Sequence, residues 1–102
     1  MKGQSRLKIG AYIYIEDIFA ENNAVIFKYS LTDRWNALSQ KKQNKYQQLM
    51  QKDLTYRTCS LQTVRISQEK GLVEVHHYYD KYPMHILFTL NANKQLCVMS
   101  GF

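Results

Sequence analysis

The 102-residue sequence predicts an α+β fold: an antiparallel sheet of two hairpins, in the order ββ-α-(α)-ββ, with one long helix packed on one face. Two observations carry the prediction. Paired segments of alternating apolar residues lie near each end of the chain, and residues 36–52 between them contain no Gly, Pro or β-branched residue. Hairpins placed around a helix are typical of this fold class. The length suits a single domain spanning 1–102, with residues 1–8 as a flexible N-terminal arm.

The first hairpin is expected from residues 9–19 and 24–32. Asn22 and Asn23 connect the two segments, and asparagine tolerates the left-handed backbone that tight turns require. The second segment carries the clearer strand pattern, because its large apolar residues alternate and so share one face: Val25, Phe27, Tyr29 and Leu31.

The long helix is expected from Asp33, acting as its cap, to about residue 52. An apolar stripe at helical spacing would face the sheet, with Trp35 in the core. Residues 53–70 fit a short second helix that ends at Gly71, where glycine suits a left-handed terminating position. A strand over residues 63–66 is the alternative.

The second hairpin is expected from residues 72–79 and 85–90, with Pro83 in the connection because proline cannot donate to a strand ladder. The later strand would face the core with Ile86, Phe88 and Leu90, and residues 96–99 fit a short final strand.

The net charge of +6 favours anionic partners, although the basic residues form two small clusters and no continuous stripe. No segment reaches the roughly 18–20 apolar residues of a membrane span. The opening residues also lack the apolar core of a signal peptide. We therefore expect either a cytoplasmic protein or one whose export signal has been removed.

Cys59 and Cys97 decide between these compartments. A bridge between them would tie the helical layer to the sheet and close a loop of about 38 residues, worth roughly 3 to 4 kcal/mol in the chain-entropy model. That interpretation predicts a periplasmic or secreted protein. The alternative is two buried thiols in a cytoplasmic protein. The spacing fits neither a zinc site nor a Cys-x-x-Cys redox motif, and no cofactor is expected.

His76, His77 and His85 are the only cluster of potential metal ligands. Adjacent strand residues point to opposite faces, so His76 and His77 would not share one metal, and we predict no metal site. No activated nucleophile, carboxylate pair or glycine-rich phosphate loop is visible, so an enzyme is not expected.

A protein-binding role is the favoured hypothesis, because aromatic and cationic residues are enriched at interface hot spots. A free sheet edge would also permit a homodimer. The alternative is a small RNA-binding or RNA-cleaving module, in which strand tyrosines stack on bases while Lys41, Lys42 and Lys45 contact phosphates. The candidate binding residues for a protein partner are Tyr12, Tyr14, Arg65, Tyr78 and Tyr79.

The chain resembles small exported bacterial proteins of unassigned role. The resemblance rests on residues 23–29, Arg65, Gly71, Val75, residues 78–80 and the two cysteines. It implies a ββ-α-ββ domain with a helix-to-strand disulfide. It also implies an accessory or binding domain of the bacterial envelope, such as a secretion component, an inhibitor or an immunity protein.

Overall fold

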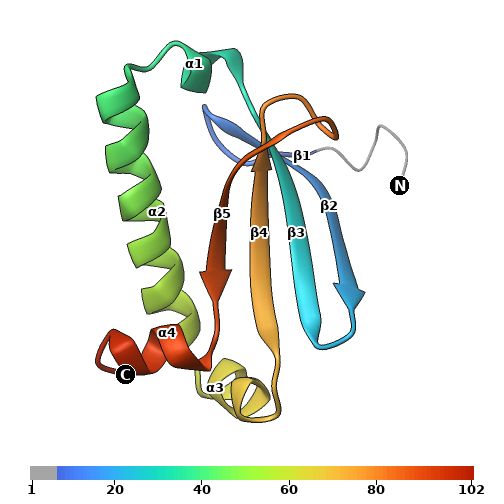
Figure 1. Cartoon of the computed structure of the whole chain (residues 1–102), viewed down its shortest axis with the longest axis vertical. Helices are drawn as coiled ribbons and strands as arrows, with labels where there is room; N and C mark the ends of the chain where they lie inside the picture. Colours follow the sequence, from blue (N-terminus) through green and yellow to red (C-terminus); the bar gives the residue numbers. More distant parts are fainter. Residues whose placement is uncertain (1–6) are drawn as a thin grey trace.

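A computed structural model of the chain describes residues 7–102, which form one five-stranded sheet and four helices (Figure 1). The α+β fold class is confirmed. Sequence order and spatial order of the strands coincide. The strands are β1 (Leu7–Lys8), β2 (Ile13–Glu21), β3 (Ala24–Leu31), β4 (Val73–Tyr79) and β5 (Ile86–Ala92).

The two hairpins are antiparallel within themselves, but β3 and β4 join them in parallel at the centre of the sheet. The sequence pattern does not predict this parallel pair. It follows from the connection: helix α2 runs back from the end of β3 to the level where β3 began, so β4 sets out in the same direction as β3 (Figure 1). Parallel neighbours need such a crossover connection.

The first strand of the hairpin, β2, begins at Ile13 and not at residue 9 as expected. Gly10, at φ 152°, lies in a bend between β1 and β2, and Leu7 and Lys8 pair back onto β2. Residues 1–6 of the expected flexible arm lie outside the described residues. The turn prediction is confirmed, because Asn22 adopts the left-handed backbone at φ 56°.

The expected single long helix is divided into α1 (Asp33–Asn36) and α2 (Gln40–Cys59). Ser39 causes the restart, since its side chain accepts a hydrogen bond from the backbone N–H of Lys42 at 3.2 Å. Asp33 is the first residue of α1 and not its cap; Thr32 holds that position and its hydroxyl donates to the carbonyl of Ala11. α2 continues beyond residue 52 because no Gly or Pro stops it.

The short helix is confirmed as α3 (Gln62–Glu69), followed by Gly71 at φ 95°. The expected final strand over residues 96–99 is wrong, because this segment is helix α4 (Lys94–Met99). Asn93 explains the difference: its side chain accepts from the N–H of Leu96 at 2.9 Å and caps the helix. The sequence pattern of four residues was too short to distinguish the two.

The core lies on the helix-facing side of the sheet, which we call the inner face. The alternation predicted for β3 is confirmed at its buried end, Tyr29 and Leu31. Tyr78 stacks between Tyr29, at 4.5 Å, and Phe88, at 4.6 Å. On β5, Phe88 and Leu90 face inward as expected, whereas Ile86 is 46% exposed because the register shifts at this end of the β4–β5 pair.

A disulfide joins Cys59, the last residue of α2, to Cys97 in α4. It therefore links two helices and not a helix and a strand. Cys59 is 4% exposed and Cys97 is fully buried. The bridge fixes α4 and the C-terminus beside the end of α2 (Figure 1).

Candidate functional site

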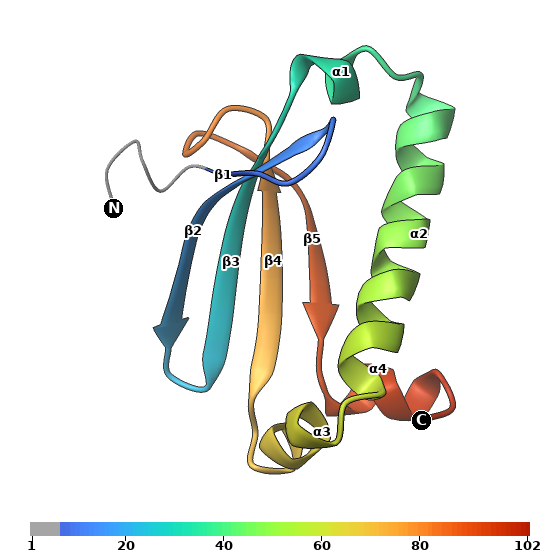
Figure 2. The same cartoon turned by 180° about the vertical axis from the view of Figure 1, so that it is seen from behind.

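The inner face borders a cleft of about 630 Å³ between the sheet and helices α2 and α3. It exists because α2 runs along β5 and not over the centre of the sheet (Figures 1 and 2). Apolar side chains dominate its walls, as is usual for binding sites in proteins. We call it the inner cleft; its apolar lining includes Ile9, Ile13, Ile15, Phe27, Met50, Leu54, Leu61, Val64 and Leu90.

A hydrogen-bonded row of three polar side chains lies on the floor of the inner cleft. The Tyr29 hydroxyl lies 2.7 Å from His76 Nδ1, and His76 Nε2 lies 3.0 Å from Glu74 Oε1. The neutral ring that carries its proton on Nε2 satisfies both contacts, because Nδ1 then accepts from tyrosine and Nε2–H donates to the carboxylate. His76 is 6% exposed and stacks on Phe27 at 4.2 Å.

Burial keeps the phenols of this region protonated. Desolvation, with a smaller contribution from the nearby Glu74 carboxylate, raises the pKa of Tyr29 to about 12. Desolvation also raises the pKa of Tyr78 far above its usual range. Tyr29 is therefore a neutral phenol that can donate a hydrogen bond, and its phenolate is not available as a base at neutral pH.

Two further charged groups line the inner cleft from α2. Arg57 Nε donates to Asp53 Oδ2 at 2.9 Å, with one helical turn between the residues. Both side chains are 64% exposed, so the pair lies at the mouth of the cleft. An exposed pair of this kind adds little to stability.

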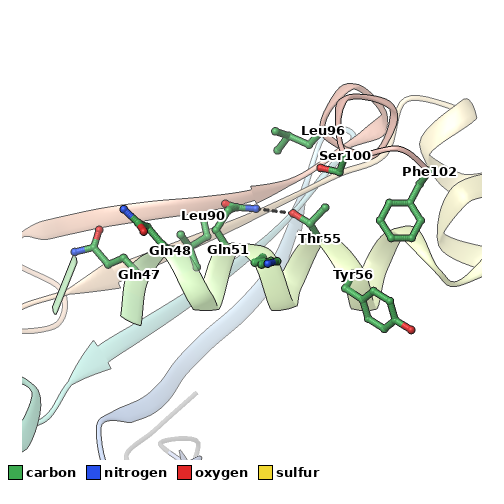
Figure 3. A pocket seen from close by; sticks show the side chains of 10 residues that line it. Gln47, Gln48, Gln51, Thr55, Tyr56, Leu90, Leu96, Ser100 and Phe102 are labelled. Carbon is green, nitrogen blue, oxygen red and sulfur yellow. Dashed lines mark hydrogen bonds between the residues drawn. The ribbon is translucent and has the colours of Figure 1, made fainter. Parts of the chain in front are cut away.

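A second hollow, the C-terminal groove, lies between α2, β5 and α4 and has a volume of about 650 Å³ (Figure 3). Gln47, Gln48 and Gln51 form its polar side, while the rings of Tyr56 and Phe102 lie at its other end. Within the described residues it is lined by no carboxylate or histidine, and Lys52 is its charged side chain. The inner cleft is therefore the better candidate for a site with defined chemistry.

The structure does not bring the five predicted binding residues onto one surface. Tyr12 packs against Trp35 on the inner side, and Tyr78 belongs to the core. Tyr14 lies on the opposite, outer face of the sheet with Tyr79, which is 6% exposed beside Tyr82. Arg65 is half-buried on α3. Of the five, Tyr78 lines the inner cleft, and a binding role for each remains a prediction.

The prediction that His76 and His77 point to opposite faces of the sheet is confirmed. His76 lies in the inner cleft, whereas His77 is on the outer face, where its Nδ1 lies 2.9 Å from Thr89 Oγ1. Burial and the charge of Lys28 lower the pKa of His77. His85 is exposed near the β4–β5 turn. Within residues 7–102 no three His, Cys, Asp or Glu side chains are placed to hold a metal ion.

Sequence reasoning missed the partnership of Glu74 with His76 and Tyr29. A signal was present: Glu74 and His76 are two positions apart on a strand and so share a face. What the sequence did not contain was the parallel β3–β4 register, which sets Tyr29 opposite Tyr78 and beside His76.

The fold and the cleft define a class: a small α+β domain with one disulfide and an open inner face. No protein-family model and no curated protein matches the sequence. Solved structures do resemble it. A candidate secreted protein of Pseudomonas aeruginosa aligns with a TM-score of 0.68 and 16% identity, covering 93% of this chain and 80% of that one. The pilotin EpsS of the Vibrio vulnificus type 2 secretion system aligns with a TM-score of 0.63 and 14% identity, covering 93% and 78%. At these identities the likeness establishes the fold.

In residues 7–102 no helix combines the length and the hydrophobicity that a membrane crossing requires.

Proposed function

We propose that this protein is a non-enzymatic accessory domain of the bacterial envelope that binds a segment of another protein in its inner cleft. The observation that carries the proposal is the inner cleft itself. Its apolar side chains, from β2, β3 and the helices, line an accessible hollow next to the packed core. Peptide segments bind grooves of this kind by inserting apolar side chains.

The compartment is part of the proposal. Disulfides persist in the periplasm and outside the cell and are rare in the cytoplasm. The bridge between Cys59 and Cys97 therefore supports an extracytoplasmic location. The likeness to a candidate secreted protein and to a secretion-system pilotin supports the same compartment and an accessory role in secretion.

The chemistry of the cleft supports binding over catalysis. His76 is occupied on both ring nitrogens, by Tyr29 and by Glu74. The hydroxyl within reach of His76 is that of Tyr29, and burial raises its pKa to about 12, which makes it a poor nucleophile at neutral pH. The RNA alternative has less support, because Tyr78 and Tyr79, two of its base-stacking rings, are each 6% exposed.

Photo-crosslinking in living cells tests the proposal. Phe27 and Phe19 are both half-buried phenylalanines of the β2–β3 hairpin, but Phe27 lines the inner cleft and Phe19 lies on the outer face. Each is replaced in turn by the photoreactive p-benzoylphenylalanine in the full chain. We expect the Phe27 position to yield one dominant adduct with an envelope protein, identified by mass spectrometry, and the Phe19 position to yield none. Equal adducts from both positions, or none from Phe27, would contradict cleft binding.

A further inference from the structure

We propose that the inner cleft selects a partner segment that carries a lysine or arginine among apolar residues, and that Glu74 receives this basic side chain. The inference rests on the proposed function, and it specifies the chemistry of the partner. Its basis is the distribution of charge inside the cleft.

Glu74 is the carboxylate that the cleft leaves uncompensated. The other acid in the lining, Asp53, is paired with Arg57 on the same helix. Glu74 has His76 as its one hydrogen-bonding neighbour within the described residues. A neutral imidazole with its proton on Nε2 satisfies both contacts of His76 and brings no charge to offset that of Glu74.

The Glu74 carboxylate borders the cleft. Its side chain is 19% exposed and belongs to the cleft lining, which also includes Val64 of α3 and Phe27 and Tyr29 of β3. One carboxylate oxygen accepts from His76 Nε2–H, which holds the group in place and leaves the other oxygen to accept from a ligand.

A half-buried carboxylate among apolar walls favours a cation over other ligands. At 19% exposure its charge is only partly hydrated, so an ammonium or guanidinium group would replace the missing contacts with water. Aromatic faces nearby add attraction for a cation. The apolar walls require that this cation be attached to an apolar segment. The protein as a whole is basic, at +6, so the acidic cleft also differs in sign from the rest of the molecule.

The probe is a phage-displayed library of random 12-residue peptides, selected on the disulfide-bonded full chain. We expect selected peptides to carry one Lys or Arg flanked by apolar residues and to shift the backbone amide signals of Phe27 and Val64 in nuclear magnetic resonance spectra. A synthetic copy with norleucine in place of the basic residue should bind about tenfold more weakly by calorimetry.

The variant Glu74→Gln assigns the effect to Glu74. Glutamine keeps an oxygen that accepts from His76 Nε2–H, so the floor of the cleft is retained while its charge is removed. We expect this variant to bind the basic and norleucine peptides equally. Glu21→Gln is the matched control, since it removes the same charge from the exposed end of β2 and should keep the tenfold preference.

The outcomes separate the two proposals. If selected peptides occupy the cleft but lack a basic residue, or if Glu74→Gln keeps the preference, the role of Glu74 is wrong while cleft binding stands. If no peptide is selected, or all of them bind elsewhere, the proposed function fails and this inference with it. Where Glu74→Gln does not fold, the norleucine comparison on the unmodified protein still tests the preference for a basic residue, and equal binding of the two peptides would contradict it.

Discussion

Tyr29 connects the chemistry of the cleft to the stability of the fold. Its ring packs in the core against Tyr78, and its hydroxyl holds the His76 ring in place through the hydrogen bond with Nδ1. A residue with both tasks has to remain a neutral phenol, since a buried phenolate would lose hydration and the bond to Nδ1.

This requirement predicts a loss of stability at alkaline pH. The unfolded chain ionises tyrosine at pH 10, whereas the folded protein holds the Tyr29 proton until about pH 12. The contribution of Tyr29 is thus complete well below pH 10, and raising the pH from 10 to 12 should remove about 2 kcal/mol of unfolding free energy. Urea denaturation across this range measures the loss.

Tyr29→Phe should make that pH dependence shallower, because phenylalanine has no proton to lose. Tyr56→Phe, at a ring that is 65% exposed, is the control and should leave the slope unchanged. An equal slope in all three proteins would show that Tyr29 does not contribute to the alkaline transition.

At the level of single residues, the alternation of apolar residues correctly predicted which side chains of β3 share a face of the sheet. It did not predict which tyrosines are accessible to a partner. Tyr29 and Leu31 were assigned to one buried face from the pattern alone. Tyr78 and Tyr79 are predicted binding residues, yet Phe88 stacks on the ring of Tyr78 and Tyr82 packs on the ring of Tyr79. Phe88 comes from β5 and Tyr82 from the loop after β4, and one sequence does not specify how that loop and strand fold back onto β4.

Among the elements, α2 and β5 are joined by an unusual contact. Gln51 Nε2 donates to the carbonyl of Asn91 at 2.9 Å, and the N–H of Asn91 donates to Gln51 Oε1 at 3.2 Å. The side-chain amide thus takes the place of one peptide unit of a neighbouring strand. It closes the edge of β5 at this position, where an open edge would invite pairing with another chain.

Replacing Gln51 with alanine should therefore release the edge of β5. We expect the unfolding free energy to fall by about 1 to 2 kcal/mol, because the variant loses the two hydrogen bonds to Asn91 and the one from Gln51 Nε2 to Thr55 Oγ1. The amide of Asn91 should also exchange its hydrogen faster. Gln48→Ala, on the same helix, is the control and should change neither quantity. Unchanged exchange at Asn91 would mean that Gln51 does not protect the edge.

The elements were predicted where their signals are long or carry a distinctive turn residue. The β2–β3 hairpin, α2 and α3 follow from alternation, from an uninterrupted helical stretch and from Gly71. The starts of α2 at Ser39 and of α4 at Asn93 were not predicted, because in each case a single capping side chain determines where the helix begins. The parallel β3–β4 pair was missed because strand direction depends on the path of the whole connection.

For the whole molecule, the disulfide attaches the C-terminal helix α4 to α2. α4 is six residues long and makes few contacts of its own, since Val98 and Met99 are 57% and 74% exposed. A helix this short is not stable by itself in water. Cys97 therefore supplies the attachment that keeps α4 against α2 and completes the C-terminal groove.

Reduction of Cys59–Cys97 should lower the unfolding free energy by about 4 kcal/mol, the chain-entropy value for the closed loop. The separation of 38 residues sets that loop. Because Cys97 has no exposed surface and Cys59 only 4%, reductant should reach the bridge only after local opening, so reduction should accelerate as urea is added. Urea titrations with and without reductant, followed by circular dichroism, measure the stability difference. The double variant Cys59→Ala, Cys97→Ala should match the reduced protein and ignore the reductant. A reduced protein as stable as the oxidised one would show that the fold does not need the bridge. The disulfide would then no longer support an extracytoplasmic location.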